Sequence, residues 1–116
     1  MVVYVKKCNI VKNNYEFNNI IKVGKCIKNN YFIIYYKTND LEKYRFGISV
    51  GKKIGNAVIR NKYKRKIRSI IDNNKKYYQK KLDYIIIMRK ACLDAEYKEI
   101  EQKCISLIKE IQKKEN

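Results

Sequence analysis

Histidine and tryptophan are missing from the 116-residue sequence, and only 11 of its residues are acidic. Without histidine, no imidazole can act as a general base or activate Ser49 or Ser69 as a nucleophile. The acids of residues 1–93 are scattered along the chain: Glu16, Asp40, Glu42, Asp72 and Asp83. A two-metal nuclease needs clustered carboxylates. We therefore expect no catalytic residue in the protein, and if it serves an enzyme, another molecule carries the chemistry.

Clustered cysteines and long apolar runs are also lacking. Cys8, Cys26, Cys92 and Cys104 are widely spaced without a C-x-x-C pair, whereas a zinc site needs three or four clustered ligands. We expect reduced, structural cysteines and no metal held by protein side chains alone. No apolar run approaches the roughly 18–20 residues of a membrane-spanning helix, and the first residues lack the features of a signal peptide. These patterns predict a cytoplasmic protein.

Positive charge is what the sequence has in excess, with 28 Lys and Arg and a net charge of +17. Residues 94–116 carry five bases and six acids, a net of −1, so residues 1–93 carry +18. Such a charge repels itself in a compact state, and an anionic partner would offset it. Nucleic acid is the leading candidate and an anionic membrane surface the second. The binding surface is expected within residues 1–93.

The hydrophobic pattern predicts a single domain of α/β (α+β) class, with helices packed on one sheet. The expected elements are a helix over 13–23, a short strand at 26–27, strands over 31–37 and 44–50, a long helix over 56–80, a strand over 83–88 and a helix over 94–114. The apolar face of the last helix is expected to contain Ile100, Cys104, Leu107, Ile108 and Ile111. We expect the strands 31–37 and 44–50 to pair antiparallel across a short connection. The run DYIIIM at 83–88 is typical of a strand buried on both faces.

The long helix combines a basic face with an apolar face. On a helical wheel, a basic arc of roughly 140° faces away from an apolar arc of roughly 80°. The basic arc contains Arg60, Asn61, Lys64, Arg65 and Arg68, and the apolar arc contains Ile59, Tyr63, Ile67 and Ile70. Lys52 and Lys53 extend the charge into the preceding loop. A solvated face is the simpler reading, but Arg60, Lys64 and Arg68 repel one another at i, i+4 spacing with no Glu interleaved, and arginine suits phosphate. We therefore expect a phosphate-binding surface.

The aromatic strand YFIIYYK offers a second candidate surface. Alternation places Tyr31, Ile33 and Tyr35 on one face and Phe32, Ile34 and Tyr36 on the other. One face must be core, and the other could stack unpaired bases. Alternatively, helices cover both faces, and the same choice between core and platform applies to Phe17.

The stretch RFGISVGKKIGNAVIRNKYKRKIR at 45–68 closely resembles the bacterial ribonuclease P protein subunit. The family's signature K-x-G-x-A-V-x-R-N-x-x-K-R-x-x-R fits at all nine fixed positions between Lys53 and Arg68. Nearly the whole chain follows the family's order of elements. The resemblance implies a two-layer sandwich with a mixed sheet of about four strands, three helices and a left-handed βαβ crossover (ribosomal protein S5 domain 2-like). Physics alone favours a right-handed crossover.

The resemblance also implies a function. The protein would be the accessory protein subunit of an endoribonuclease, ribonuclease P, whose catalytic RNA and bound Mg2+ remove the 5′ leader of precursor tRNA. Its partners would be that catalytic RNA and precursor tRNA, with no membrane and no protein partner. We further expect the subunit to strengthen precursor binding and to lower the magnesium requirement by supplying positive charge near the cleavage site.

The matching positions assign two sets of residues. The RNA-binding helix and loop would use the matching residues Lys53, Arg60, Asn61, Lys64, Arg65 and Arg68, together with Lys52, which the charge of the loop adds. The leader-binding cleft would use Phe17, Ile21, Ile33, Tyr35, Arg89 and Lys90. Ile21 departs from the family pattern, because many members carry an aromatic there, so stacking at that position is lost.

Three other readings compete with this one. A structural RNA-binding protein of the ribosomal type, without a role in cleavage, needs the basic helix but not Phe17 and Tyr35. A membrane-surface protein needs a wider apolar arc than this helix has. A protein-only nuclease needs the acids and histidine that the sequence lacks.

Overall fold

A computed structural model describes residues 10–11, 14–41, 43–78 and 81–115 of the chain. The elements are α1 (Asn14–Val23), β1 (Lys25–Lys28), β2 (Phe32–Thr38), β3 (Arg45–Ser49), α2 (Ala57–Asn73), β4 (Leu82–Met88) and α3 (Tyr97–Glu115). Short 3-10 turns η2 (Lys52–Ile54), η3 (Lys75–Tyr77) and η4 (Lys90–Asp94) join them. The strands form one sheet in the order β1-β2-β4-β3. The described residues thus confirm the mixed sheet and the three helices expected from the sequence.

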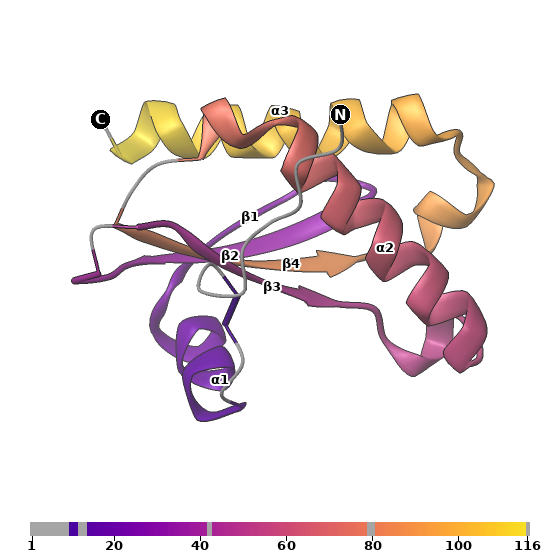
Figure 1. The fold of residues 1–116 in the computed structure, drawn as a ribbon, viewed down its shortest axis with the longest axis horizontal. Helices are drawn as coiled ribbons and strands as arrows, with labels where there is room; N and C mark the ends of the chain where they lie inside the picture. Colours follow the sequence, from indigo (N-terminus) through magenta and orange to yellow (C-terminus); the bar gives the residue numbers. More distant parts are fainter. Residues whose placement is uncertain (1–9, 12–13, 42, 79–80, 116) are drawn as a thin grey trace.

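Helices cover the two faces of the sheet unequally. Figure 1 shows α2 and α3 on one face and the shorter α1 on the other. The face toward α2 and α3 holds the main core, to which β2 contributes Phe32, Ile34 and Tyr36. The expected apolar face of α3, made by Ile100, Cys104, Leu107, Ile108 and Ile111, is fully buried there. The opposite face has a smaller core around Val11, Ile20 and Ile85, and α1 covers it only in part.

The alternation predicted for the aromatic strand is confirmed along β2 itself. Phe32, Ile34 and Tyr36 are buried, while Ile33 and Tyr35 on the α1 side are half-buried. Tyr31 does not join Ile33 and Tyr35, as was predicted, because it precedes the strand. Its ring packs against the main core, and its hydroxyl donates a hydrogen bond of 2.8 Å to the Glu99 carboxylate of α3.

The predicted antiparallel pairing of residues 31–37 with 44–50 is wrong. β4 lies between β2 and β3, antiparallel to the first and parallel to the second. The run from Leu82 to Met88 is buried at every position except Ile87, and a strand this apolar is most stable with neighbours on both edges. The connection after β2 therefore does not form a hairpin with β3. Its Asn39 backbone amide donates a hydrogen bond to the carbonyl of Lys81, the residue before β4.

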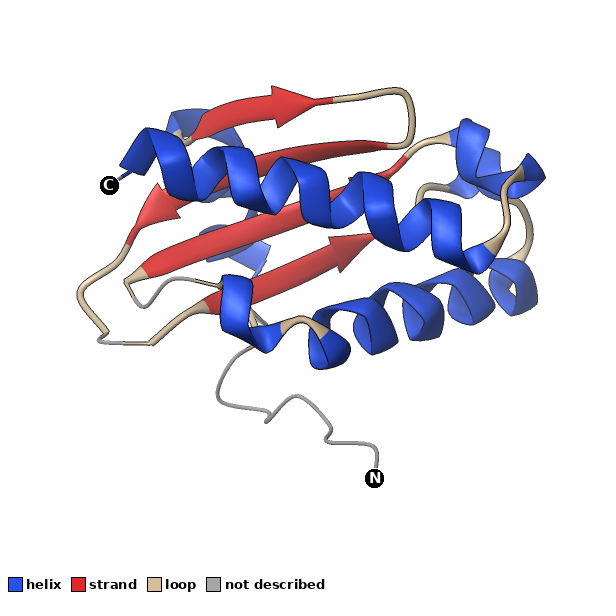
Figure 2. Cartoon of the chain, turned by 90° about the horizontal axis from the view of Figure 1, so that it is seen from above, coloured by secondary structure: helices blue, strands red, loops and turns tan. Residues whose placement is uncertain are grey.

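The parallel pair β3 and β4 is joined by α2, which returns across the main-core face. Followed from β3 through α2 to the adjacent β4 in Figure 2, this crossover is left-handed. That handedness agrees with the family resemblance and departs from the general right-handed rule. Because β3 and β4 are parallel, their ends that precede η2 and η4 lie at the same end of the sheet.

The long helix is shorter than predicted. It begins after Asn56, whose side chain accepts a hydrogen bond from the Ile59 amide, and ends at Asn73 rather than at residue 80. Asn74 stops it, because its side chain donates to the Ile70 carbonyl at 2.8 Å and to Glu101 of α3 at 3.0 Å. The chain then turns through η3, which seats Tyr78 in the core. The predicted final helix likewise starts later, at Tyr97, because residues 90–94 form η4.

Candidate nucleic-acid interface

An apolar surface lies beside α1 on the less covered face of the sheet. Phe17 and Ile21 from α1 pack with Tyr35 of β2 and Ile87 of β4 around buried Ile20 and Ile85. The four outer side chains are only half-buried, so they present apolar and aromatic surface to solvent. Half-exposed rings beside a sheet can stack on unpaired bases. The surface therefore has the chemistry that single-stranded RNA requires.

A groove with cationic walls continues this surface at the ends of β3 and β4. It has a volume of about 920 Å³ and an apolar floor formed by Ile33, Ile54, Ile87 and Met88. Its walls carry Lys52 and Lys53 from η2, and Arg89 and Lys90 from the end of β4. Parallel pairing of β3 with β4 brings these two basic pairs together, although they lie far apart in the sequence. The described residues that line it include four cations and no carboxylate, so the groove favours a polyanion.

Arg89 is held in place at the groove by the β1–β2 turn. Its amide donates to the Tyr31 carbonyl at 2.9 Å, and its Nη1 donates to the Asn29 carbonyl at 3.0 Å. The Asn29 side chain in turn accepts hydrogen bonds from the Tyr31 and Phe32 amides. The guanidinium is thus held by a backbone carbonyl, and within the described part of the chain it forms no ion pair with an acid.

The basic face of α2 divides into two parts. Lys64 and Arg68 line a hollow of about 140 Å³ at the β3 edge, together with Phe17 and Gly47. Ile10 and Val11 also line it, and the Val11 amide donates to the Phe46 carbonyl at 2.9 Å, so this segment pairs with the β3 edge. Asn61 and Arg65 are exposed on the helix, and Arg60 is half-buried. Part of the basic helix therefore meets the apolar surface beside α1.

The structure thus places most of the predicted residues in three adjoining groups. Phe17, Ile21 and Tyr35 pack together at α1, Ile33 joins the groove with both basic pairs, and Lys64 and Arg68 of α2 share a hollow with Phe17. Arg60, Asn61 and Arg65 of α2 lie outside these groups. Sequence reasoning missed Ile54, Ile87 and Gly47. Ile87 was read as part of a strand buried on both faces, but it is half-exposed on the face that α1 covers only in part.

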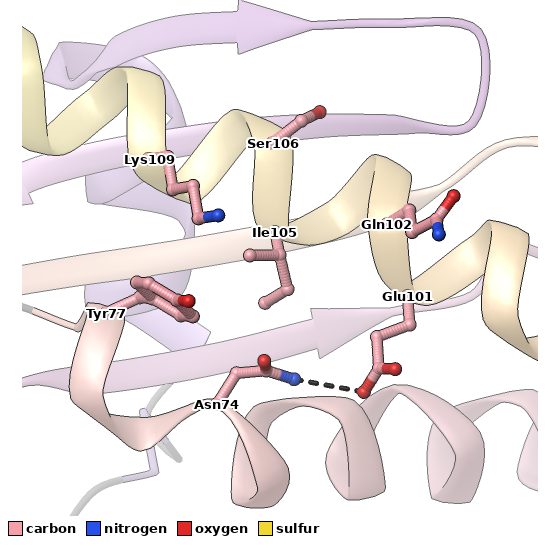
Figure 3. Close-up of a pocket in the computed structure, with 7 residues that line it drawn as sticks. All are labelled: Asn74, Tyr77, Glu101, Gln102, Ile105, Ser106 and Lys109. Carbon is pink, nitrogen blue, oxygen red and sulfur yellow. Dashed lines mark hydrogen bonds between the residues drawn. The ribbon is translucent and has the colours of Figure 1, made fainter.

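Another hollow, of about 290 Å³, lies on the far side of the molecule between α3 and the end of α2 (Figure 3). Its lining carries the Glu101 carboxylate, which accepts from Asn74, and the Lys109 ammonium, which lies 4.7 Å from the Tyr77 ring centroid. Charges of both signs, already paired with neighbours, do not select a polyanion. The groove with the two basic pairs is the better nucleic-acid site.

In the described part of the chain, none of the helices combines the length and the apolar character that spanning a bilayer requires. No group of three or more cysteine, aspartate or glutamate side chains gathers there in a way that could hold a metal ion.

The chain was compared with known proteins at the levels of sequence and structure. The profile of the family described as Ribonuclease P matches residues 5–112. The ribonuclease P protein component of Mycoplasma mycoides subsp. mycoides is 49% identical over 108 residues, covering 92% of this chain and 99% of that protein. The component from Streptococcus agalactiae is 39% identical, covering 90% and 95%.

Solved structures give the same result. The RNase P protein of Staphylococcus aureus superimposes with a TM-score of 0.81 at 35% identity, covering 92% of this chain and 97% of that one. The RNase P protein from Thermotoga maritima superimposes with a TM-score of 0.80 at 32% identity, covering 86% and 94%. Sequence, fold and the arginine-rich signature agree, and the chain belongs to the ribonuclease P protein family.

Proposed function

We propose that this chain is the accessory protein subunit of a ribonuclease P particle and that it binds both the catalytic RNA and the 5′ leader of precursor tRNA. The observation that carries the proposal is the groove in which Lys52, Lys53, Arg89 and Lys90 surround an apolar floor. A single-stranded leader offers phosphates to such walls and bases to such a floor. The family to which the chain belongs supports the identity of the two RNAs.

The two RNAs would use different parts of the surface. The leader would lie along Phe17, Tyr35 and Ile33 into the groove, where aromatic and apolar side chains adjoin the cations. The catalytic RNA would bind the exposed side of α2, where Asn61 and Arg65 extend into solvent. Folded RNA needs donors held at fixed spacing, and a helix supplies them.

The hydrolysis itself belongs to the RNA in this proposal. The groove lining offers ammonium and guanidinium groups, whereas Mg2+ requires oxygen ligands, so the lining does not fit a magnesium site. The catalytic RNA would hold most of the Mg2+ and would carry out hydrolysis at the scissile phosphate. The protein would add positive charge near that phosphate, which lowers the magnesium concentration that the particle needs.

Reconstitution tests the proposal. A ribonuclease P RNA is folded, and leader release from precursor tRNA is measured at low magnesium with and without the protein. We expect strong stimulation that is lost when the leader is shortened to a single nucleotide. No stimulation with the cognate RNA, despite salt-sensitive RNA binding, would contradict the proposal and leave a structural RNA-binding protein.

A pair of double variants tests the groove. Lys52→Ala with Lys53→Ala removes two charges from the groove, while Lys113→Ala with Lys114→Ala removes two exposed charges from the end of α3. Each lost contact to a single-stranded phosphate lowers the slope of log K against log salt by about 0.7. We expect the groove variant to lower the slope for the leader-bearing precursor by about 1.4 and the α3 variant to change it little. Equal effects would mean that only total charge matters.

A further inference from the structure

We propose that Glu16, Arg45 and Gly47 are positioning residues, which fix α1 on the sheet so that Phe17 is presented to the leader. This inference rests on the proposed function, because it concerns how the same surface is held in shape. α1 packs on β2 and β4 and covers its face of the sheet only in part. Its angle on the sheet therefore decides where Phe17 and Ile21 lie.

The first link is an ion pair between α1 and β3. Nη1 of Arg45 lies 2.6 Å from Oε2 of Glu16, and the Arg45 side chain is only 16% exposed. Glu16 immediately precedes Phe17 on α1, so the pair acts at the residue next to the ring.

Arg45 is itself fixed on the sheet by β4. Its Nε donates to Oδ1 of Asp83 at 2.9 Å and its Nη2 to Oδ2 at 2.7 Å, and the Asn39 side chain donates to the same carboxylate at 2.6 Å. The hydrogen bonds to Asp83, and secondarily the one to Glu16, raise the pKa of Arg45, so the guanidinium stays charged. Because Nε and Nη2 of the planar Arg45 guanidinium both donate to Asp83, Nη1 is left to point toward α1. The chain Asp83–Arg45–Glu16 thus ties α1 to both parallel strands.

The second link is the close packing of the Phe17 ring on Gly47 of β3. A Cβ atom placed on Gly47 would lie 2.6 Å from Cε2 of Phe17 and 3.0 Å from Cδ1 of Ile85. The ring therefore rests directly on the β3 backbone, which only glycine permits. Arg45 and Gly47 are alternate residues on one face of β3, and they hold the consecutive residues Glu16 and Phe17.

Removing Glu16 should change leader binding in opposite directions under a positioning role and under simple electrostatics. Glu16 is an acid beside a surface proposed to bind a polyanion, so by charge alone its removal strengthens leader binding. If Glu16 positions Phe17 through Arg45, its removal weakens leader binding instead. Alanine is a good helix former and Glu16 is 43% exposed, so Glu16→Ala leaves α1 able to form.

The test measures the dissociation constant of the reconstituted particle for two precursors, one with a leader long enough to cross the sheet face and one with a single-nucleotide leader. Glu16→Ala is compared with Glu16→Gln, which keeps an acceptor for Arg45, and with Glu110→Ala, a control that removes an exposed acid from α3. We expect Glu16→Ala to weaken binding of the long leader about fivefold, as for loss of one partly exposed ion pair that holds a contact. Glu16→Gln should be intermediate, and the single-nucleotide precursor should be unaffected.

A second comparison tests the packing of Phe17 on Gly47. Gly47→Ala should weaken binding of the long leader in the natural chain and change it little when Phe17 is already alanine, because the clash is then relieved. Thermal unfolding of each variant shows whether it is folded. If Gly47→Ala weakens long-leader binding equally in the natural chain and in the Phe17→Ala chain, the packing role of Gly47 is refuted.

The outcomes distinguish the two proposals. If the natural chain binds both precursors equally well, the proposed leader function fails and this inference fails with it. If the natural chain favours the long leader and Glu16→Ala binds it as tightly or more tightly, the leader function stands and the positioning role is refuted.

Discussion

Asp83→Asn should cost more stability than any exposed substitution in this protein. Asp83 is buried, with its side chain 4% exposed, and its carboxylate accepts two hydrogen bonds from Arg45 and one from Asn39. Removing one partner of a buried ion pair costs about 3–5 kcal/mol, because the other charge is left uncompensated. Asparagine at position 83 keeps one acceptor oxygen, and Arg45 keeps its ion pair with Glu16. We therefore expect a loss of unfolding free energy at the lower end of this range, about 3 kcal/mol.

That loss is large for a domain whose total stability is of the order of 5–15 kcal/mol. For a chain of this length it lowers the melting temperature by roughly 12 °C, taking about 4 °C per kcal/mol. Urea unfolding followed by circular dichroism measures the free energy, and Asp40→Asn, at an exposed position, is the matched control with an expected change within about 0.5 kcal/mol. A loss below about 1 kcal/mol for Asp83→Asn would refute the reasoning, since the guanidinium would then be satisfied without its carboxylate.

Three further outcomes are expected. Tyr78→Phe should stabilise the fold by up to about 1 kcal/mol in urea unfolding, because the buried Tyr78 hydroxyl has no hydrogen-bond partner among the described residues, and a loss would reveal one. Burial raises the pKa of Cys92 from 9.0 to about 11 and that of Cys104 from 9.0 to about 12, so their contribution to stability is full below pH 9 and is lost as pH rises toward 12. Mass-resolved thiol labelling should therefore modify exposed Cys26 in the folded chain, and Cys92 and Cys104 only on unfolding. Gly24→Ala should destabilise by more than about 1 kcal/mol in the same assay, because its Cβ would lie 2.4 Å from the Ile20 carbonyl oxygen and 2.8 Å from that of Tyr36.

Local patterns in the sequence were enough to predict most elements. The period-2 alternation of β2 and the apolar stripe of α3 predict which side chains face the core. Both predictions are confirmed by the burial of these side chains. Strand order was not predictable in this way, because pairing depends on partners distant in the sequence. β4 displaces β3 from β2, since its apolar run from Leu82 to Met88 needs cover on both edges. The end of α2 was missed for a similar reason, because Asn74 is fixed partly by Glu101 of α3.

The candidate site was predictable in its residue types but not in its assembly. The family signature supplied the basic residues of the loop and helix, and alternation supplied Ile33 and Tyr35. Nothing local shows that Lys52 and Lys53 face Arg89 and Lys90 across one groove, which follows only from the parallel pairing of β3 with β4. The Asp83–Arg45–Glu16 chain was likewise invisible, because its three members come from three elements.

The meeting of α2 and α1 at the β3 edge changes how the basic helix should be understood. Lys64 and Arg68 share a hollow with Phe17, while Arg65 lies exposed elsewhere on the same helix. A leader placed beside Phe17 would therefore have cations on two sides, from α2 at the β3 edge and from the groove where β3 and β4 end. Under the proposed function, Lys64 and Arg68 would serve the leader as well as the catalytic RNA, and Arg65 the catalytic RNA alone. The like charge along α2 is then divided between two RNA molecules, which explains why one ordered helix carries so much of it with no acid between Ala57 and Ile71.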